Sequence, residues 1–360
     1  MTETTSPADL RRVVNLADLE PLARARMESP SFDYVAGGAW DEITLGESVE
    51  AWRRYRFVPR VLRDVRHVDL SGRFLGRSSS LPIAIAPMAA QAMAHPGAEA
   101  EMLRGAAAAG IPFCLSTSSS MTMEEVAAAA PDADRWFQLY VIRDLAYSRT
   151  LVERAAASGY RAIVLTVDLP VLGFRERDRR SGFSLPAMPH MDAPADAPPT
   201  RYGALEHDRG IGLTWDTIAE IRSWSSLPLV LKGILSADDA RIAAGAGVAG
   251  IIVSTHGGRQ LDRSVSSADV LAEIVGAVGG RCEVWADGGI RRGLDIVAAL
   301  ALGATGVLIG RPFYWALAAA GSAGVEHAAS ILRTELDLAL ALLGCTSTAE
   351  VRRDLLHRTR

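Results

Sequence analysis

The run Ala249-Gly250-Ile251-Ile252-Val253 is uniformly apolar, and Ser254-Thr255-His256-Gly257-Gly258-Arg259-Gln260-Leu261-Asp262 follows it directly. A short apolar run rich in β-branched residues is typical of a strand that is covered on both faces. The residues after it place an imidazole three positions before a guanidinium, with two glycines between them that let the backbone approach a ligand. This pattern predicts a proton acceptor beside an anion-binding group at the end of a buried strand.

Seven more apolar runs occur from residue 82 onward, and alanine-rich segments with helical spacing separate most of them. They cover residues 82–86, 113–115, 136–140, 162–166, 227–232, 283–286 and 306–309. Because the runs do not alternate between polar and apolar residues, they are typical of a parallel sheet with crossover helices. Eight in series predict a (β/α)8 TIM barrel. A doubly wound sheet, the competing fold, is disfavoured because no Gly-x-Gly-x-x-Gly motif follows the first run.

The spacing of the runs also predicts how the chain is organised. We expect one domain over residues 1–360, with an N-terminal helical cap (1–80), the barrel (81–345) and an active-site flap (176–212) after the fourth strand. Asn15 is expected to start a helix over residues 16–27, and Thr122 with Glu125 forms a capping-box pattern. The flap is rich in Pro, Asp and Gly, which predicts a long mobile loop over the catalytic face.

Composition excludes several classes of protein. The formal charge is −4 with both signs mixed along the chain, so we expect no nucleic-acid partner. The three cysteines are widely spaced and mostly in apolar surroundings, which favours free thiols in the cytoplasm over a disulfide framework or a metal site. No stretch resembles a secretory signal or a membrane span, so we expect no membrane association.

Polar residues stand at the ends of the predicted strands, and in a barrel such residues converge on one face. They are Gln138 and Tyr140, Thr166 and Asp168, Lys232, Ser254 and His256, Asp287, and Arg311. The last two strands are followed by Asp287-Gly288-Gly289-Ile290-Arg291-Arg292 and by Gly310-Arg311, which predict a phosphate-binding loop pair. Lys232 could stabilise a reduced flavin ring, with Gln138 and Thr166 at its polar edge, or form a structural salt bridge.

With these motifs the chain resembles the FMN-dependent 2-hydroxy-acid oxidases and dehydrogenases, the family of glycolate oxidase, lactate oxidase, mandelate dehydrogenase and hydroxymandelate oxidase. The likeness extends from about residue 16 to residue 343. It rests on Phe32-Asp33-Tyr34, Ala36-Gly37-Gly38-Ala39, Ile85-Ala86-Pro87, Ala94-His95-Pro96, Phe137-Gln138-Leu139-Tyr140, Leu165-Thr166-Val167-Asp168, Leu231-Lys232-Gly233, the nonapeptide at 254–262, and Asp287-Gly288-Gly289-Ile290-Arg291.

The resemblance implies a role for each matching position. It makes His256 the catalytic base, Asp168 its carboxylate partner, Arg175 and Arg259 the clamp on the substrate carboxylate, and Tyr34 and Tyr140 hydroxyl donors to the substrate. It implies that FMN is held by Pro87, Met88, Ala89, Ser116, Gln138, Thr166, Lys232, Ser254, Asp287, Gly289, Arg291, Gly310 and Arg311. It also implies a homotetramer. We expect no metal site.

Some positions depart from the family pattern. Thr255 replaces the usual Asn, which could loosen the surroundings of His256, and Val171 and Phe174 replace arginines, which leaves Arg175 as the cation of that turn. Ser118 stands where glycolate oxidases carry Trp, and Met88 lines the same pocket. Loss of an indole favours a larger substrate, of mandelate or 4-hydroxymandelate type, although Ser118 could instead cap the following helix.

The predicted reaction is therefore oxidation of a 2-hydroxy acid to the 2-oxo acid, with O₂ as acceptor and hydrogen peroxide as the second product. Alternatives are a dehydrogenase or monooxygenase acting on lactate-like acids, a flavin-barrel isomerase, and a flavin-binding protein without turnover. The 2-hydroxy-acid enzyme is favoured because it explains why Tyr34, Tyr140, Arg175 and Arg259 would surround one carboxylate.

Overall fold

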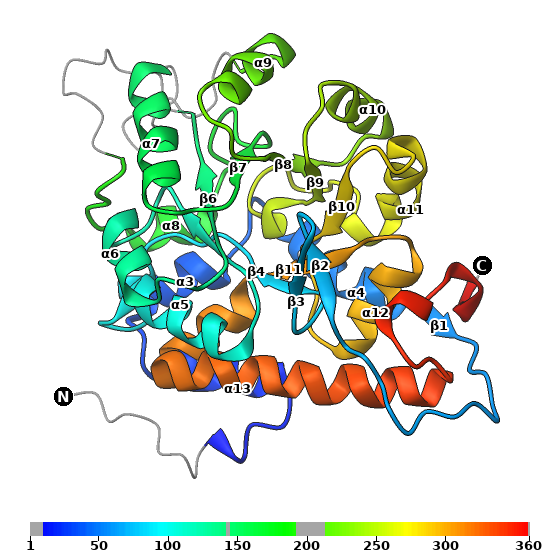
Figure 1. Cartoon of the computed structure of the whole chain (residues 1–360). Helices are drawn as coiled ribbons and strands as arrows, with labels where there is room; N and C mark the ends of the chain where they lie inside the picture. The colour runs from blue at the N-terminus through cyan, green and yellow to red at the C-terminus, as the bar shows by residue number, and fades with distance from the viewer. Residues whose placement is uncertain (1–9, 142–144, 192–212, 359–360) are drawn as a thin grey trace.

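The computed structural model describes residues 10–141, 145–191 and 213–358. Eight parallel strands form a closed barrel, which Figure 1 shows in the middle of the view with helices around it. They are β4 (Ile83–Ile85), β5 (Phe113–Ser116), β6 (Arg135–Leu139), β7 (Ile163–Thr166), β8 (Leu229–Ile234), β9 (Gly250–Val253), β10 (Glu283–Ala286) and β11 (Gly306–Ile309). All eight predicted strands are present, and the predicted TIM barrel is confirmed.

A helix follows each barrel strand. These helices are α5 (Ala98–Ala109), α6 (Met123–Ala129), α7 (Leu145–Ala157), α9 (Trp215–Ser223), α10 (Ala237–Gly245), α11 (Ser267–Val278), α12 (Gly293–Ala301) and α13 (Arg311–Leu343). The backbone of α13 is not helical at Ala320 and Gly321, so it consists of two helical stretches. The capping box of Thr122 and Glu125 is present at the start of α6, as the pattern predicts.

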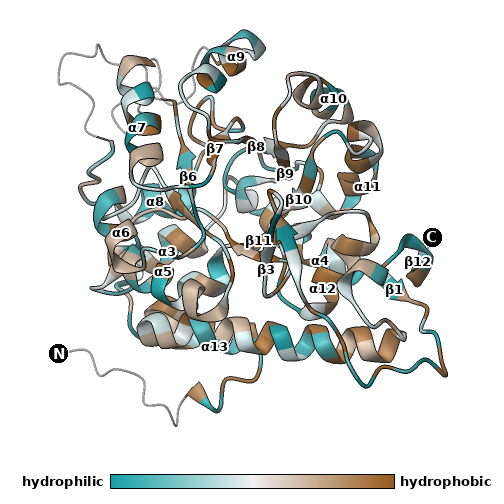
Figure 2. Ribbon diagram, in the orientation of Figure 1, coloured by the Kyte–Doolittle hydropathy of each residue, from teal (hydrophilic) through white to brown (hydrophobic). Residues whose placement is uncertain are grey.

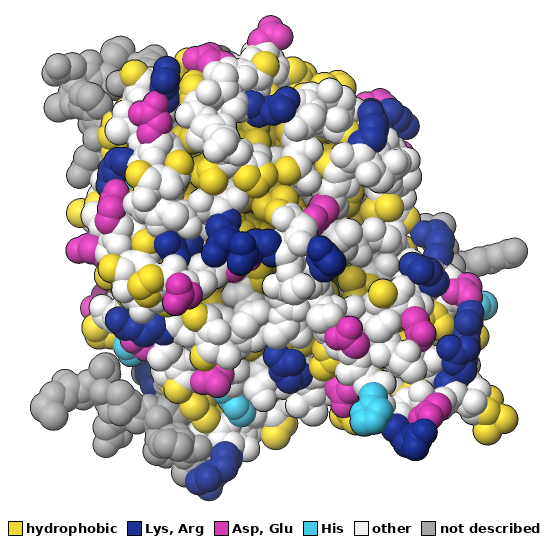
Figure 3. Space-filling model, viewed as in Figure 1, with side chains coloured by type: hydrophobic (Ala, Val, Ile, Leu, Met, Phe, Trp, Pro, Cys, Tyr) yellow, Lys and Arg dark blue, Asp and Glu magenta, His cyan; other side chains and the backbone are white. Residues whose placement is uncertain are grey.

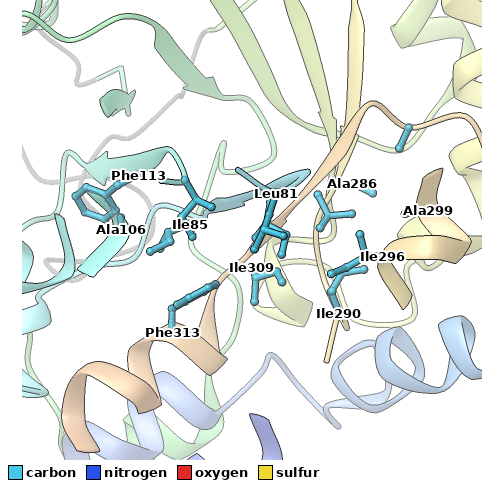
Figure 4. Packing of buried hydrophobic residues seen from close by; sticks show 14 of the residues in the cluster. Leu81, Ile85, Ala106, Phe113, Ala286, Ile290, Ile296, Ala299, Ile309 and Phe313 are labelled. Atoms are coloured by element: carbon cyan, nitrogen blue, oxygen red, sulfur yellow. The ribbon is translucent and has the colours of Figure 1, made fainter. Parts of the chain in front are cut away.

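Two apolar clusters hold the barrel together. The larger one fills the space between strands and helices, where the side chains of Ala106 and Phe113 lie together in Figure 4. The smaller one lies inside the barrel and includes Trp136 and Trp285, whose rings are 5.6 Å apart. The strands alternate between the two clusters along their length, which is why their sequences are apolar throughout. In Figure 2 brown segments recur on the central strands, interrupted by teal and white ones.

Residues 10–80 lie at both ends of the barrel. Helices α3 (Ser29–Ala36) and α4 (Ile43–Arg53) contribute to the mouth at the carboxyl ends of the strands. The hairpin of β2 (Gly72–Phe74) and β3 (Arg77–Ser79) instead lies at the opposite end, where Phe74 packs on Trp136 and Trp285. This second position was not predicted, because a three-residue strand leaves no periodic signal.

The start of the chain and the β7–α9 connection differ in detail from expectation. Asn15 caps a 3-10 turn, η1 (Leu16–Asp18), which α2 (Leu19–Arg24) continues, so the helix expected to reach residue 27 ends at Arg24. Strand β1 (Tyr55–Phe57) pairs with β12 (Leu356–Arg358) near the C-terminus. The flap begins with α8 (Glu176–Ser181), and its part at 192–212 lies outside the described residues. The remaining 3-10 helices are η2 (Gln91–Met93), η3 (His256–Gly258), η4 (Thr348–Glu350) and η5 (Arg353–Leu355).

Charges on the surface contribute little to holding this fold. Figure 3 shows Lys and Arg side chains interspersed with Asp and Glu on the face in view. Exposed ion pairs such as Arg241 with Asp238 contribute roughly 0–1 kcal/mol each. Within the described residues, no helix is both long enough and apolar enough to cross a lipid bilayer.

Candidate active site at the barrel mouth

A cavity of about 820 Å³ opens at the carboxyl ends of the strands. Most residues singled out in the sequence line it: Tyr34, Pro87, Met88, Ala89, Ser116, Ser118, Tyr140, Thr166, Arg175, Lys232, His256, Arg259, Asp287, Gly289, Arg291, Gly310 and Arg311. Asp168, Gln138 and Ser254 are not among the lining residues but contact them from behind. One cavity of a size typical for small-molecule sites therefore collects residues from across the chain.

His256 and Asp168 form the central pair of the site. His256 Nδ1 lies 2.8 Å from Asp168 Oδ1, although 88 positions separate the two residues in the sequence. The His256 backbone is left-handed, with φ +53°, and its N–H donates to Ser254 Oγ at 3.0 Å. Gly233 makes room for the pair, because a Cβ at this position would lie 2.5 Å from the Asp168 side chain. The ring is thereby held with Nδ1 toward Asp168.

The charge states of this pair follow from burial and from neighbouring charges. Burial lowers the pKa of His256, and Lys232 and Arg175 lower it further, while Asp168 acts in the opposite direction. Burial alone would raise the pKa of Asp168, but the charges of His256 and Lys232 outweigh it and the net pKa is lowered. A neutral imidazole beside an ionised carboxylate can accept a proton, and the carboxylate stabilises the imidazolium that results.

Two tyrosines and two arginines lie beside the imidazole. The Tyr140 hydroxyl is 3.4 Å from His256 Nε2. The guanidinium carbon of Arg259 lies 4.6 Å from the centre of the Tyr34 ring, and that of Arg175 lies 5.8 Å from it. Burial and the charge of Arg259 lower the pKa of Arg175 to about 10, so the Arg175 guanidinium remains charged at neutral pH. The arrangement forms an anion-binding corner next to a proton acceptor.

Arg259 has a second set of contacts that the sequence did not indicate. Its Nη1 donates to the backbone oxygens of Tyr34 and Gly37, the latter at 2.9 Å. Arg311, expected at a phosphate, also donates to the Gly37 oxygen, as well as to the oxygens of Val35 and Gly257. Both arginines therefore attach the N-terminal cap to the barrel mouth while lining the cavity.

A polar layer lies under one side of the cavity. Gln138 donates through Nε2 to Thr166 Oγ1 and accepts from Ser116 Oγ, each at 3.0 Å. Lys232 Nζ lies 2.8 Å from Ser254 Oγ and 3.1 Å from Asp287 Oδ2. Asp287 thus serves as counter-ion to Lys232, and strand β8 continues past Lys232 to Ile234 instead of ending there. The structural salt bridge left open for Lys232 is present, and its side chain lines the cavity as well.

The opposite side of the cavity fits a phosphate group. Arg291 and Arg311 are partly buried beside Gly289 and Gly310, and this burial lowers the pKa of both guanidiniums. In the part of the chain that is described, neither guanidinium forms an ion pair with a carboxylate. Two partly buried cations without an ion-paired carboxylate, next to glycine backbone, are the groups that a bound dianion would satisfy. The residues present therefore fit the phosphate end of FMN.

The remaining wall of the cavity is largely apolar, and the sequence did not reveal most of it. It comprises Met88, Leu169, Leu172, Phe183, Leu185, Met188 and Met191, together with Asp178. The Phe183 ring stacks on that of Tyr34 at 4.6 Å. Met88 comes from the β4–α5 loop, and the others come from the β7–α9 connection. Apolar side chains in that connection follow no helical or strand period, so periodicity does not reveal them.

The residues that depart from the family pattern differ in burial and in their contacts. Ser118 is buried in the cavity wall, and its Oγ has no hydrogen-bond partner among the described residues. The cap of the next helix is Thr122, so the alternative that Ser118 caps this helix is wrong. Thr255 Oγ1 lies 3.5 Å from Ser48 Oγ of the N-terminal cap. Val171 and Phe174 are partly exposed, with 38% and 40% of their surface accessible.

Comparison with known proteins covers nearly the whole chain. Residues 23–358 match the family described as FMN-dependent dehydrogenase. The chain is 46% identical to an L-lactate oxidase from Nostoc sp., over 99% of this chain and all of the relative. It is 44% identical to a 4-hydroxymandelate oxidase from Amycolatopsis orientalis, over 94% of this chain and 97% of the relative. A crystal structure of mandelate oxidase is similar with a TM-score of 0.88 and 45% identity, over 96% of this chain and 98% of that one.

Proposed function

Because the chain belongs to the FMN-dependent dehydrogenase family, with FMN as its cofactor, we propose that it oxidises a bulky aryl 2-hydroxy acid to the 2-oxo acid. The observation that carries this proposal is the pair of His256 and Asp168 beside the guanidiniums of Arg175 and Arg259 in one cavity. A 2-hydroxy acid presents a carboxylate next to a carbon that must lose hydrogen. The cavity offers a matching anion site next to a proton acceptor.

The arginines bind and orient the substrate. Two guanidiniums that lie near the Tyr34 ring can bind the two oxygens of a carboxylate, and the hydroxyl groups of Tyr34 and Tyr140 can contact the substrate's polar atoms. A carboxylate held at this corner leaves the hydroxyl and the α-carbon facing His256. Fixing the reacting atoms in this way lowers the entropic cost of the reaction.

His256 moves the proton. Oxidation of R–CH(OH)–COO⁻ to R–CO–COO⁻ releases two electrons and two protons, and His256 Nε2 takes one of these protons. It accepts the hydroxyl proton if the α-hydrogen leaves as hydride, or the α-proton if a carbanion forms first. Asp168 stabilises the imidazolium in either route, since Nδ1 lies 2.8 Å from its carboxylate. Bound FMN would supply the two-electron acceptor, and Lys232 would favour the negative charge of its reduced ring.

The substrate class is inferred from the apolar wall. Ser118 in place of a bulky aromatic residue leaves room beside Met88, Met188 and Met191, and this surface suits a phenyl group. The likeness to mandelate oxidase and to 4-hydroxymandelate oxidase supports this choice, whereas the likeness to L-lactate oxidase makes small acids the main competitors. We further propose O₂ as the acceptor, which yields hydrogen peroxide. Homotetramer formation and a cytoplasmic location stay predictions.

A substrate panel tests the proposal directly. Purified holoenzyme would be mixed anaerobically with (S)-mandelate, (S)-4-hydroxymandelate, (S)-lactate and glycolate, and bleaching of the flavin absorbance would be followed. We expect the aryl acids to bleach it fastest, and air to restore the colour with stoichiometric peroxide. A colourless protein after expression with ample riboflavin would refute the cofactor assignment, and faster bleaching by glycolate or lactate would refute the aryl preference. Restoration of the colour only by an added acceptor, and not by air, would identify a dehydrogenase.

A further inference from the structure

His190 is a buried histidine outside the catalytic pair. Its side chain has no accessible surface, although Pro186 and Ala187, a few residues earlier in the same loop, are exposed. The residue belongs to a turn in which the N–H of Met191 donates to the oxygen of Met188 at 2.9 Å. A polar ring is rarely buried so completely in a loop unless its nitrogens are satisfied, so its contacts define what it does.

The two ring nitrogens take part in one chain of hydrogen bonds with a fixed direction. The N–H of Met123 donates to His190 Nε2 at 3.0 Å, which satisfies the first amide of helix α6. Ser119 Oγ donates to the Met121 oxygen at 2.7 Å, so toward His190 it can only accept, from Nδ1–H at 3.1 Å. Each nitrogen thus has one role, and the ring must be neutral.

The charges around the ring agree with this neutral state. Burial lowers the pKa of His190 to about 4, and the guanidinium of Arg154 contributes in the same direction. Glu124 and Glu125, on helix α6, act in the opposite direction but do not outweigh burial. The ring also contacts Phe137 of strand β6 edge-on, with centroids 5.7 Å apart. His190 is therefore fixed to a barrel strand and to the loop that precedes α6.

These contacts determine where two sides of the cavity lie. Met188 and Met191 flank His190 and are 7% and 8% exposed, and both line the cavity. Ser118 lines the cavity from the β5–α6 loop, and the next residue, Ser119, accepts the hydrogen bond from His190 Nδ1. The His190 imidazole thus fixes the position of Met188 and Met191 relative to the part of the wall that carries Ser118.

We propose that His190 is a positioning residue that sets the selectivity of this site for 2-hydroxy acids with large side chains. The proposal rests on the proposed function and extends it to a residue that touches neither substrate nor cofactor. Loss of the ring would release Met188 and Met191 from the wall and would weaken contacts that a phenyl group makes and a methyl group does not. The carboxylate corner at Arg175 and Arg259 is formed by other contacts and would be left in place.

The test compares large and small acids on the holoenzyme of the wild type, His190→Ala and His190→Gln. Gln can offer an oxygen to the Met123 amide and is the conservative variant. We expect His190→Ala to lower the ratio of kcat/KM for (S)-mandelate to that for (S)-lactate by at least about tenfold, mainly through KM for mandelate. His190→Gln should recover part of the ratio. The matched control is His327→Ala, whose ring contacts the Val13 oxygen from helix α13, and it should keep the wild-type ratio.

A binding measurement gives a readout that does not depend on turnover. Dissociation constants of 2-phenylpropionate and of propionate, which lack the hydroxyl, would be obtained from the change in flavin absorbance. We expect His190→Ala to weaken binding of 2-phenylpropionate by about tenfold and to leave that of propionate nearly unchanged. Equal losses for both acids, or an unchanged ratio, would overturn the proposal.

Folding failures and failures of the proposed function remain distinguishable. If His190→Ala does not fold, His190→Gln and Ser119→Ala take its place, and unchanged ratios in both would overturn the role of His190. If the wild type oxidises neither hydroxy acid, the proposed function is wrong. The two dissociation constants would then still decide whether His190 sets selectivity for large acids.

Discussion

Lys232 and Asp287 form a buried ion pair across the barrel mouth, with 3.1 Å between Nζ and Oδ2. They come from strand β8 and from the end of strand β10, and both side chains are less than one-tenth exposed. Asp287 and Asp168 together outweigh the effect of burial and raise the pKa of Lys232. The ammonium is therefore charged where it faces the cavity, and its charge depends on carboxylates that other strands deliver.

Lys232→Met should destabilise the protein strongly, because it leaves the Asp287 carboxylate buried without its partner. Removing one member of a buried pair typically costs about 3–5 kcal/mol of unfolding free energy. The double variant Lys232→Met/Asp287→Asn should recover part of this loss in denaturant unfolding at fixed FMN concentration. Arg241→Met, at an exposed pair, is the control and should change the unfolding free energy by less than about 1 kcal/mol. An equal loss of unfolding free energy in Lys232→Met and Arg241→Met would contradict the buried ion pair of Lys232 and Asp287.

His256→Ala should keep its flavin but lose turnover. The change removes the proton acceptor, and loss of a general base usually lowers the rate by about 10²–10⁴-fold. Steady-state kcat with (S)-mandelate and the flavin absorbance of the purified variant would be measured together. His67→Ala, an exposed histidine, serves as the control. Turnover within a few-fold of the wild type would remove His256 from the mechanism.

Arg259→Met should chiefly raise KM. One guanidinium of the carboxylate corner is lost while Arg175 remains, and a hydrogen bond to a charged group contributes about 1.5–3 kcal/mol. This corresponds to roughly a 10- to 150-fold increase in KM. Thermal unfolding should accompany the kinetics, since Arg259 also holds the backbone oxygens of Tyr34 and Gly37. A wild-type KM in a folded variant would argue against the clamp.

Acid should destabilise the protein partly through His190. Its pKa is lowered from 6.5 to about 4 in the folded state, so between these values the unfolded chain takes up a proton that the native protein does not. The unfolding free energy therefore falls as the pH drops below 6.5, and the loss approaches about 3 kcal/mol below pH 4. Denaturant unfolding between pH 7 and pH 4 should show a shallower fall for His190→Gln. Parallel curves for the wild type and the variant would contradict this.

Most of the barrel could be predicted because its signals are local. A run such as 162–166 is apolar over five consecutive residues, and the capping box of Thr122 and Glu125 lies within four. Both patterns depend only on residues that are close in the chain, so they can be recognised without knowledge of the fold. Polar residues at the strand ends of a barrel converge on one face. This rule predicts that His256, Lys232 and Arg311 lie at one mouth, and all three line the same cavity.

The sequence-based expectations were wrong or incomplete at helix boundaries and where contacts between distant residues determine the position of a side chain. The helix expected to reach residue 27 ends at Arg24, and a new helix begins at Ser29 with Pro30 in its first turn, a position that proline favours. Gln138 and Ser254 lie behind the cavity surface because their side chains are used by Thr166, Ser116 and Lys232. Propensity and spacing do not report which partner a polar side chain will find.

The sequence by itself determined the family, the eight strands and the residue types at the barrel mouth, because these follow from local patterns and from motifs of adjacent residues. Only the tertiary structure decided that Asp287 neutralises Lys232 and that an apolar wall comes from the β7–α9 connection. The physical reason is that pKa values, ion pairs and cavity walls depend on distances between side chains remote in sequence. Those distances are set when the barrel closes.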